Sequence, residues 1–222
     1  MGGMTPRQLG QLVGSCVVLG FGVVLLLTAH LGSDGYSMLV NGLHLTTGLA
    51  FWLMNVLVGV AFVAVAWLRG RCPGWGTVIQ PVLVGVTVSA GLAALSEPRA
   101  LWLRVGYLVA AMPVLGFGVA GYLATGTGAG PAEGLALTTE PRIRFRWSYS
   151  VLQSAATLAG WLLGATFGVG TFLVAFGMGP LVDLLMTRAR WLTPPAAQAS
   201  LRGRRKVNVS NGVSAPSGPE TS

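Results

Sequence analysis

Six long stretches of the chain carry almost no charge, and this pattern limits the folds open to it. Each is close to the ~20 apolar residues that a helix needs to cross a bilayer, and none has the polar stripe of a soluble amphipathic helix. Five contain no Asp, Glu, Lys or Arg, and the sixth contains only Asp183. They cover residues 11–29, 49–68, 77–95, 105–123, 147–164 and 171–185. The sequence therefore predicts an all-α polytopic membrane protein with six transmembrane helices.

Composition excludes the main competing classes of protein. Only 9% of the 222 residues are charged and 53% are hydrophobic, whereas soluble domains carry roughly 25% charged residues. A water-exposed surface cannot be covered by so few charges, and intrinsic disorder needs a low hydrophobicity. An ordinary soluble enzyme and a largely disordered chain are both excluded.

The basic residues predict the orientation. If the N-terminus is inside, 12 of the 14 Lys and Arg residues lie on the inner side and only Arg99 and Arg104 lie outside. Cytoplasmic loops of membrane proteins are enriched in these residues, so both termini are predicted to be cytoplasmic. The same distribution argues against a nucleic-acid partner and makes the lipid bilayer the expected one. We expect one transmembrane domain over residues 1–190, with an uncleaved first helix, and a disordered basic tail over residues 191–222.

The chain contains an internal repeat. Val18–Val23 recurs unchanged as Val114–Val119, an offset of 96 residues, and a Trp-Leu-x-Gly-x-x-x-Gly-x-Gly-Thr pattern starts at both Trp67 and Trp161, an offset of 94. Each half, residues 11–95 and 105–187, holds three predicted spans. An odd number of spans requires the second half to be inverted relative to the first, an arrangement common in secondary transporters. A duplication that only builds a stable bundle is the alternative.

Glycines mark the turn between the second and third span of each half. Glycine accepts a positive φ at little cost, and a threonine at the start of an apolar run can cap the next helix. The turn residues are Gly74, Gly76, Thr77, Gly168, Gly170 and Thr171. The spacing of Gly160, Gly164 and Gly168 predicts close helix packing, within the chain or in a homodimer.

These residues also carry a family resemblance. Residues 160–171, residues 179–182 and the Gly128–Pro131 turn make the chain similar to the YczE/YyaS/YitT family of bacterial membrane proteins, closest to its YczE-like branch. The resemblance implies a six-span protein of the bacterial plasma (inner) membrane, with transport or export of small molecules as one suggested role. Tyr149 and Gln153 stand where relatives tend to carry Arg and Glu, and Ala132-Glu133 replaces a basic-acidic pair. These replacements weigh against transferring a proton-coupled mechanism from the family.

Five polar residues within the predicted spans are candidates for a substrate path: Asn55, Gln80, Tyr149, Gln153 and Asp183. Polar groups inside a membrane tend to face the bundle interior. Asn55 and Tyr149 are equivalent in the repeat, so an inverted fold is expected to bring them together. The alternatives are hydrogen bonding between helices and, for Asp183, pairing with Arg188.

Residues that would indicate other chemistry are sparse. His30, Asp34 and His44 match no metal-binding spacing and are expected at the surface, so we predict no metal and no cofactor. No nucleophile–base constellation or carboxylate pair is present, so an enzyme is not expected. Two functions stay open: a small secondary transporter or exporter of an unidentified small molecule, and a non-transporting membrane partner or regulator of another complex.

Overall fold

The computed structural model describes residues 4–96, 98–139 and 145–188, and this part of the chain is helical without a strand. The predicted disordered tail lies outside these residues. The elements are α1 (Pro6–Thr28), α2 (Gly35–Thr47), α3 (Phe51–Leu68), α4 (Trp75–Ala94), α5 (Leu101–Ala124), α6 (Pro131–Ala136), the short 3-10 helix η1 (Leu137–Thr139), α7 (Phe145–Leu162) and α8 (Val169–Arg188).

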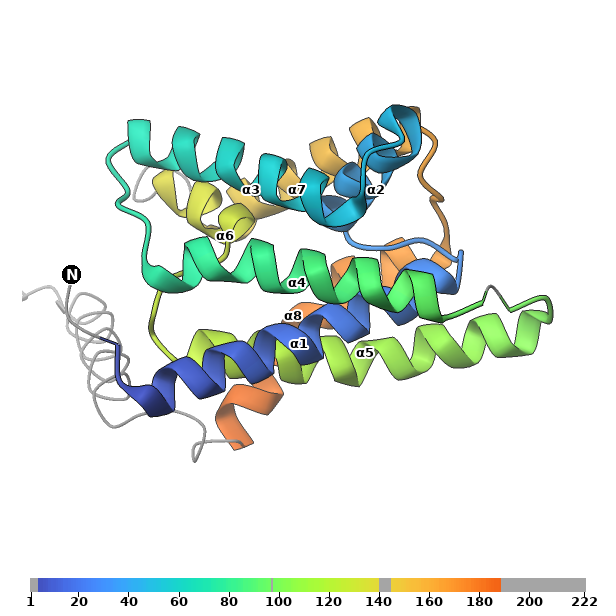
Figure 1. Cartoon of the computed structure of the whole chain (residues 1–222), viewed down its shortest axis with the longest axis horizontal. Coiled ribbons are helices and arrows are strands. Elements are labelled where there is room, and N and C mark those ends of the chain that lie inside the picture. Colours follow the sequence, from blue (N-terminus) through green and yellow to red (C-terminus); the bar gives the residue numbers. More distant parts are fainter. Residues whose placement is uncertain (1–3, 97, 140–144, 189–222) are drawn as a thin grey trace, which may run out of the picture.

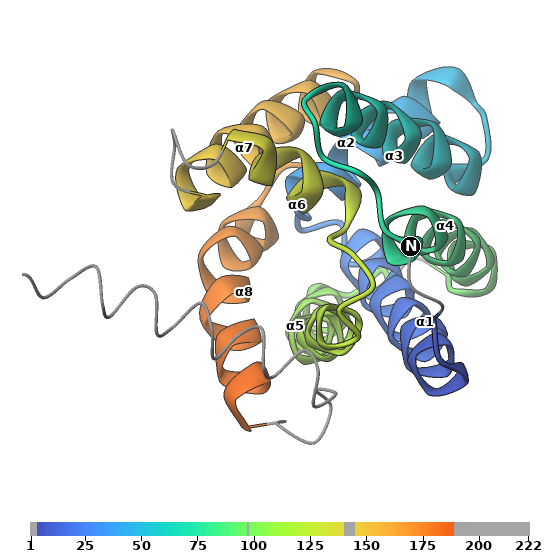
Figure 2. The same cartoon turned by 90° about the vertical axis from the view of Figure 1, so that its left-hand side faces the viewer.

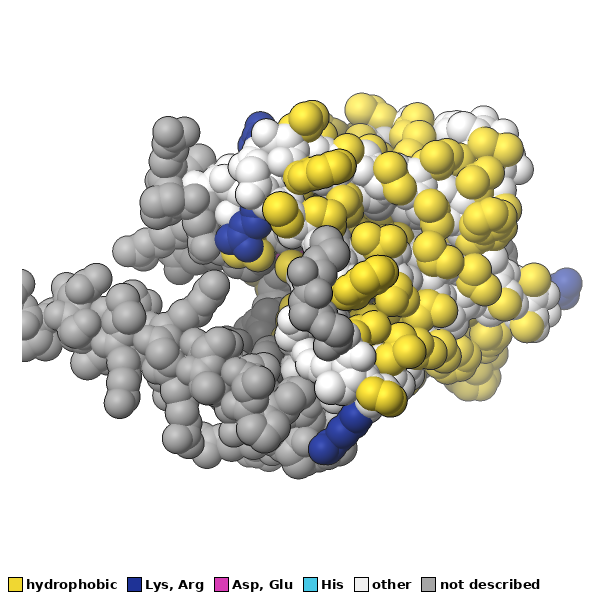
Figure 3. Space-filling view, turned by 60° about the vertical axis from the view of Figure 1, so that its left-hand side comes forward, with side chains coloured by type: hydrophobic (Ala, Val, Ile, Leu, Met, Phe, Trp, Pro, Cys, Tyr) yellow, Lys and Arg dark blue, Asp and Glu magenta, His cyan; other side chains and the backbone are white. Residues whose placement is uncertain are grey.

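The six longest of these helices coincide with the six predicted stretches, so the all-α prediction is confirmed. Four of them, α1, α3, α4 and α5, are long and apolar enough to cross a membrane. Among the described residues, the apolar segment of α8 is Val169–Met178, which is shorter than the four spans. Apolar side chains cover much of the face shown in Figure 3. Among the exposed large ones, Trp67, Trp102 and Phe176 are 65%, 73% and 77% exposed. Such a surface suits lipid rather than water.

Two short helices, α2 and α6, were not predicted, because they lie in segments that hydropathy assigns to loops. The Asp34 side chain caps α2 at its start, and Gly48 ends it with a φ of 71°. The α6 helix has Pro131 in its first turn, where a missing N–H costs nothing. Figure 2 shows α6 inside the bundle, beside α3 and α7, rather than at its surface.

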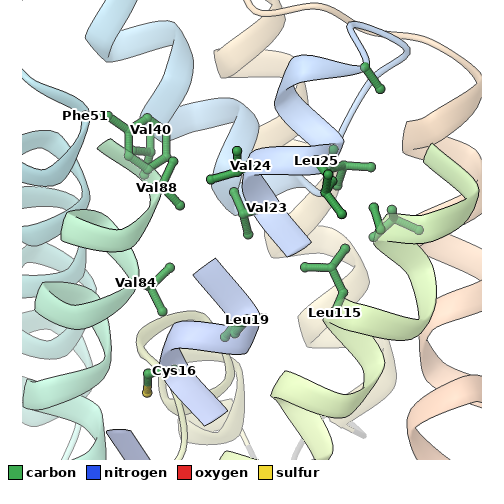
Figure 4. Close-up of a cluster of buried hydrophobic side chains, with 14 of the residues drawn as sticks. Cys16, Leu19, Val23, Val24, Leu25, Val40, Phe51, Val84, Val88 and Leu115 are labelled. Carbon is green, nitrogen blue, oxygen red and sulfur yellow. The ribbon is translucent and has the colours of Figure 1, made fainter. Parts of the chain in front are cut away.

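Helices α1 and α5 run antiparallel through the molecule (Figure 1) and pack at two glycines. A Cβ on Gly22 would lie 2.8 Å from Leu115 Cγ, and a Cβ on Gly118 would lie 2.6 Å from Leu19 Cα. Leu19 and Leu115 are both buried at this crossing (Figure 4). The core continues from there to α4, through Val84 and Val88.

Polar side chains tie the ends of this helix pair together. Gln8 Nε2 donates to the Thr125 carbonyl oxygen at the end of α5, over 3.3 Å. At the opposite end, the Arg104 guanidinium donates to the carbonyl oxygens of Ala29 and His30, over 2.8 and 3.0 Å. These carbonyls follow the last turn of α1 and have no partner within the helix. Arg104, one of the two basic residues predicted outside, thus caps α1.

Two proline-containing helices are continuous. Pro81 lies inside α4 and Pro113 inside α5. Pro180 belongs to α8, but its side chain is outside the described residues. The close packing predicted for the glycine series holds for Gly160, whose Cβ would collide with the Met38 backbone, and for Gly168, whose Cβ would lie 2.5 Å from the Leu31 oxygen. Packing within the chain does not hold for Gly164, whose Cβ position has no atom within 4 Å; Gly164 instead turns the chain after α7, with a φ of 93°.

Candidate functional site

A polar network centred on Tyr36 joins three helices in the interior. The Tyr36 backbone N–H, in the first turn of α2, donates to Gln153 Oε1 on α7 over 3.1 Å. Its hydroxyl donates to the backbone oxygen of Asn55 on α3, also over 3.1 Å. The Tyr36 ring also meets the Phe62 ring of α3 edge-on. One residue therefore connects α2 to both α3 and α7.

On α7, polar residues at a spacing of four form one side of the helix. Gln153 Nε2 donates to the Tyr149 hydroxyl over 3.2 Å. The next residue in the series, Thr157, lies beside Gly35 at the start of α2, where a Cβ would be 2.8 Å from its Oγ1. Because residues four apart share a helix face, this stripe faces α2 rather than the surface. It also explains why α7 is less apolar than the other long helices.

On α3, Asn55 connects the network to α4. It is 3% exposed, and its Nδ2 donates to the Pro81 carbonyl oxygen over 2.6 Å. Gly85, one turn further along α4, allows the helices to approach, because a Cβ there would lie 3.0 Å from Trp52 Cα. An amide buried this deeply is stable only if it is hydrogen-bonded, and the close approach of α3 and α4 supplies the partner.

A second polar group surrounds Gly130, the N-cap of α6. A Cβ at Gly130 would collide with the Glu133 carboxylate and lie 2.8 Å from Gln80 Oε1 and 3.2 Å from the Tyr122 hydroxyl oxygen. Oxygens from α4, α5 and α6 thus converge on one backbone position. Gln80 Oε1 and the Tyr122 hydroxyl are buried without a hydrogen bond of standard geometry.

Two carboxyl groups lie near these networks, at the starts of the short helices. The Asp34 carboxylate accepts from the Ser37 N–H over 3.0 Å. Burial raises the pKa of Asp34 above its ordinary value. Burial likewise raises the pKa of Glu133 and outweighs the hydrogen bonds from its own backbone and from Tyr122, which lower it; the charge of Asp34 adds a smaller upward shift. Both groups therefore hold a proton more firmly than an exposed carboxyl.

A cavity of about 280 Å³ opens beside α6. It lies between the turn that joins α3 to α4, which contributes Cys72, and the loop before α6, which contributes Gly128. Pro131 and Gly134 also line it, on either side of Glu133 in the sequence. Cys72 is exposed, whereas Cys16 is buried in α1.

The two glycine turns make equivalent contacts. Gly76 N donates to Thr127 O over 3.1 Å, and Gly170 N donates to Leu31 O over 2.7 Å. Thr77 caps the start of α4 from the third residue of the helix, while Gly74 occupies the N-cap position. The Thr77 Oγ1 accepts from the N–H of Gly74 over 3.3 Å and donates to the Ala129 oxygen over 2.7 Å. Thr171 occupies the matching place in α8, and its hydroxyl faces the Met38 sulfur at 3.6 Å.

Of the five predicted path residues, the structure brings three into one connected network. Asn55, Tyr149 and Gln153 are joined through Tyr36, although Asn55 and Tyr149 do not bond directly. Gln80 belongs instead to the group around Gly130. Asp183 lies on α8, but its side chain is outside the described residues.

Tyr36, Tyr122 and Glu133 were not among the predicted path residues. Hydropathy places Tyr36 and Glu133 in loops and Tyr122 at the end of an apolar span. The glycine-rich segments just before Tyr36 and Glu133 could have indicated both residues, and the basic-acidic pair of relatives at Ala132-Glu133 is a second signal for Glu133. Asp34 was expected at the surface with His30 and His44, but it is part-buried and caps α2.

Comparisons with known proteins agree on one family. The model of a family of unknown function, DUF6198, matches residues 7–187. An uncharacterised protein of Haemophilus influenzae is 30% identical over 175 residues, which cover 76% of this chain and 78% of that protein. An uncharacterised membrane protein, YczE of Bacillus subtilis, is 26% identical over 167 residues, which cover 73% and 78%. The predicted YczE-like resemblance is confirmed. No solved structure matches the chain.

Proposed function

Because this chain belongs to the DUF6198 family, whose description assigns no activity, we propose a function from its interior: it is a small secondary transporter or exporter. The observation that carries the proposal is the hydrogen-bonded network of Tyr36, Asn55, Tyr149 and Gln153. In a multi-pass membrane protein, polar groups away from water are costly and tend to line pathways. Short helices and irregular loops within the bundle are also typical of transporter sites.

Recurring contacts support two inverted halves as the framework of the path. Gly22 contacts Leu115, and Gly118 contacts Leu19. Gly118 lies 96 residues after Gly22, and Leu19 lies 96 residues before Leu115, so the second contact is the repeat equivalent of the first. The Gln8–Thr125 and Arg104–Ala29 contacts are related by the same shift. Reciprocal contacts of this kind are what a two-fold axis generates. We place the substrate path between the halves, with α7 and α8 as the fifth and sixth spans.

The path residues suit a small molecule with hydrogen-bonding groups. Tyr36, Asn55, Tyr149 and Gln153 offer hydroxyls and amides rather than fixed charges, so they favour a neutral polar or zwitterionic molecule. The competing function, a non-transporting partner or regulator of another complex, predicts a dry interior and a partner that copurifies in stoichiometric amount.

Flux through reconstituted protein tests the proposal. Proteoliposomes are challenged with radiolabelled amino acids, amines, sugars and organic acids, and uptake of the label is measured with and without a proton gradient. We expect at least one class to give a protein-dependent signal. Tyr36→Phe should lower it about two- to tenfold, because one interhelical hydrogen bond contributes about 0.5–1.5 kcal/mol. Tyr107→Phe on α5, outside the network, is the matched control. Absence of flux with every class, or equal flux in Tyr36→Phe and wild type, contradicts the proposal.

The proposed orientation, with both termini in the cytoplasm, places the turn between α3 and α4 inside the cell. Its exposed Cys72 is a natural reporter, because Cys16 is buried. We expect a membrane-impermeant maleimide to label inside-out vesicles and not spheroplasts, and Cys72→Ser to abolish the labelling. Labelling of intact spheroplasts would reverse the orientation.

A further inference from the structure

The oxygens around Gly130 outnumber the hydrogen-bond donors beside them. Gln80 Oε1 can only accept a hydrogen bond, and an ionised Glu133 carboxylate can only accept. Tyr122, which is 2% exposed, has one O–H to give, and its oxygen has no hydrogen bond of standard geometry. A buried polar atom without a partner is unfavourable, because it loses its hydrogen bonds to water and gains none in return. When Glu133 is charged, its own backbone N–H and the Tyr122 O–H donate to the carboxylate, and Gln80 Oε1 is left without a donor.

A bound metal ion does not fit this gap. The position on which the three oxygens converge is that of a Cβ on Gly130, one covalent bond from its Cα, so an ion cannot occupy it. Within the described residues, no group of three His, Cys, Asp or Glu side chains is arranged to hold a metal. A proton needs no such space, because it resides on an oxygen already present.

A proton on Glu133 supplies the missing donor. The resulting O–H can donate to Gln80 Oε1, while the Tyr122 O–H donates to the other carboxyl oxygen. The surrounding charges favour this state: Asp34, at the start of α2, repels a charge on Glu133. The other titratable groups that interact with Glu133 are Tyr36 on α2, Tyr122 on α5 and Tyr149 on α7, and none of them is a cation.

We propose that Glu133, Gln80 and Tyr122 form a proton-binding site inside the bundle. In the described conformation Glu133 is a neutral carboxylic acid; it releases its proton to water when the helices around Gly130 move, and the carboxylate takes one up on return. The cavity beside α6 is lined by Pro131 and Gly134, which lie on either side of Glu133 in the sequence. A role for this proton in driving transport rests on the proposed function, whereas its binding does not.

Infrared spectroscopy of the purified, reconstituted protein tests the site. At about pH 7 an ordinary glutamate, with a pKa near 4.3, is ionised. We expect a carboxylic-acid C=O band that persists in Asp34→Asn and disappears in Glu133→Gln. Tyr122→Phe should shift this band to higher frequency, because the carbonyl loses its donor. A purely structural role of the side chain predicts no such band.

The inference is overturned if wild-type protein shows no carboxylic-acid band at about pH 7, or if the band survives in Glu133→Gln. If Glu133→Gln does not fold, two other measurements test the site. They are the pH titration of the carboxylic-acid band in wild-type protein and the shift of that band in Tyr122→Phe. Sodium added at constant pH should leave the band unchanged, and its loss would favour a cation site instead. If the carboxylic-acid band is present but the protein transports no tested substrate, the result contradicts the proposed function and still supports the proton site.

Thermal stability gives an independent measurement. Because the folded-state pKa of Glu133 is raised by burial, the stability that its proton contributes is fully present at low pH and is lost as the pH rises through that raised pKa. Glu133→Gln keeps a neutral group, so its melting temperature should fall less with rising pH than that of wild type. Asp34→Asn is the control for Asp34, the second carboxyl whose pKa is raised by burial. Identical pH profiles of wild type and Glu133→Gln would contradict the site.

Discussion

Gly118→Leu is expected to prevent α1 and α5 from packing and to give little or no folded protein. A Cβ at this position would lie 2.6 Å from Leu19 Cα and 2.7 Å from Leu19 N. These are backbone atoms, so no change of side-chain rotamer relieves the collision and the helices themselves must separate. We expect a loss of about 3 kcal/mol or more, at or above the upper end of the overpacking range. Yield and melting temperature in detergent measure it.

Gly106→Leu on the same helix is the matched control. Gly106 has no atom within 4 Å of its Cβ position, so the same side chain should be tolerated there, with little change in melting temperature. Gly118→Ala should fall between the two, because its single methyl group already meets the Leu19 backbone. If Gly118→Leu melted like Gly106→Leu, the described crossing of α1 and α5 would be wrong.

Gly32→Ala should destabilise the bundle by about 2–4 kcal/mol, through two separate effects. Gly32 has a φ of 102°, where a Cβ costs about 1–3 kcal/mol in strain. The new methyl group would also collide with the Thr171 hydroxyl and lie 2.8 Å from Gly168 N. It would thereby push the turn before α8 away from the loop between α1 and α2. A shift in melting temperature is the measurement.

Gly164→Ala separates strain from collision. Gly164 has a similar φ of 93° but no atom within 4 Å of its Cβ position. It should show the strain alone, so its melting temperature should fall less than that of Gly32→Ala. Equal losses in the two variants would mean that the turn does not contact Gly32 as described.

The long helices were predictable because their signal is local and repeated over many residues. A continuous apolar run, with glycines and charges at its ends, indicates a span without knowledge of its neighbours. The same rule hid α2 and α6, because thirteen and six residues are too few to span a membrane. Tyr36 and Glu133, on these short helices, were missed for that reason. Asn55 and Gln153 were found because an amide stands out in an apolar helix.

Some roles depend on neighbours that are far away in the sequence. The sequence predicts that Thr77 caps a helix, but it does not show that the same hydroxyl also donates to the Ala129 oxygen, 52 residues further along the chain. Gly160 and Gly164 look equivalent in their series, but only Gly160 faces another backbone. Sequence spacing shows which residues share a helix face, and it does not show what that face meets.

The sequence by itself determined that this protein is helical, lies in a membrane and resembles the YczE-like proteins, because hydropathy and local motifs are properties of contiguous residues. Only the tertiary structure decided that the Glu133 carboxyl, Gln80 Oε1 and the Tyr122 hydroxyl meet around Gly130. They come from three helices, and the absence of a side chain on that glycine allows α4, α5 and α6 to converge. Such a meeting depends on backbone approach between distant segments, which no local pattern encodes.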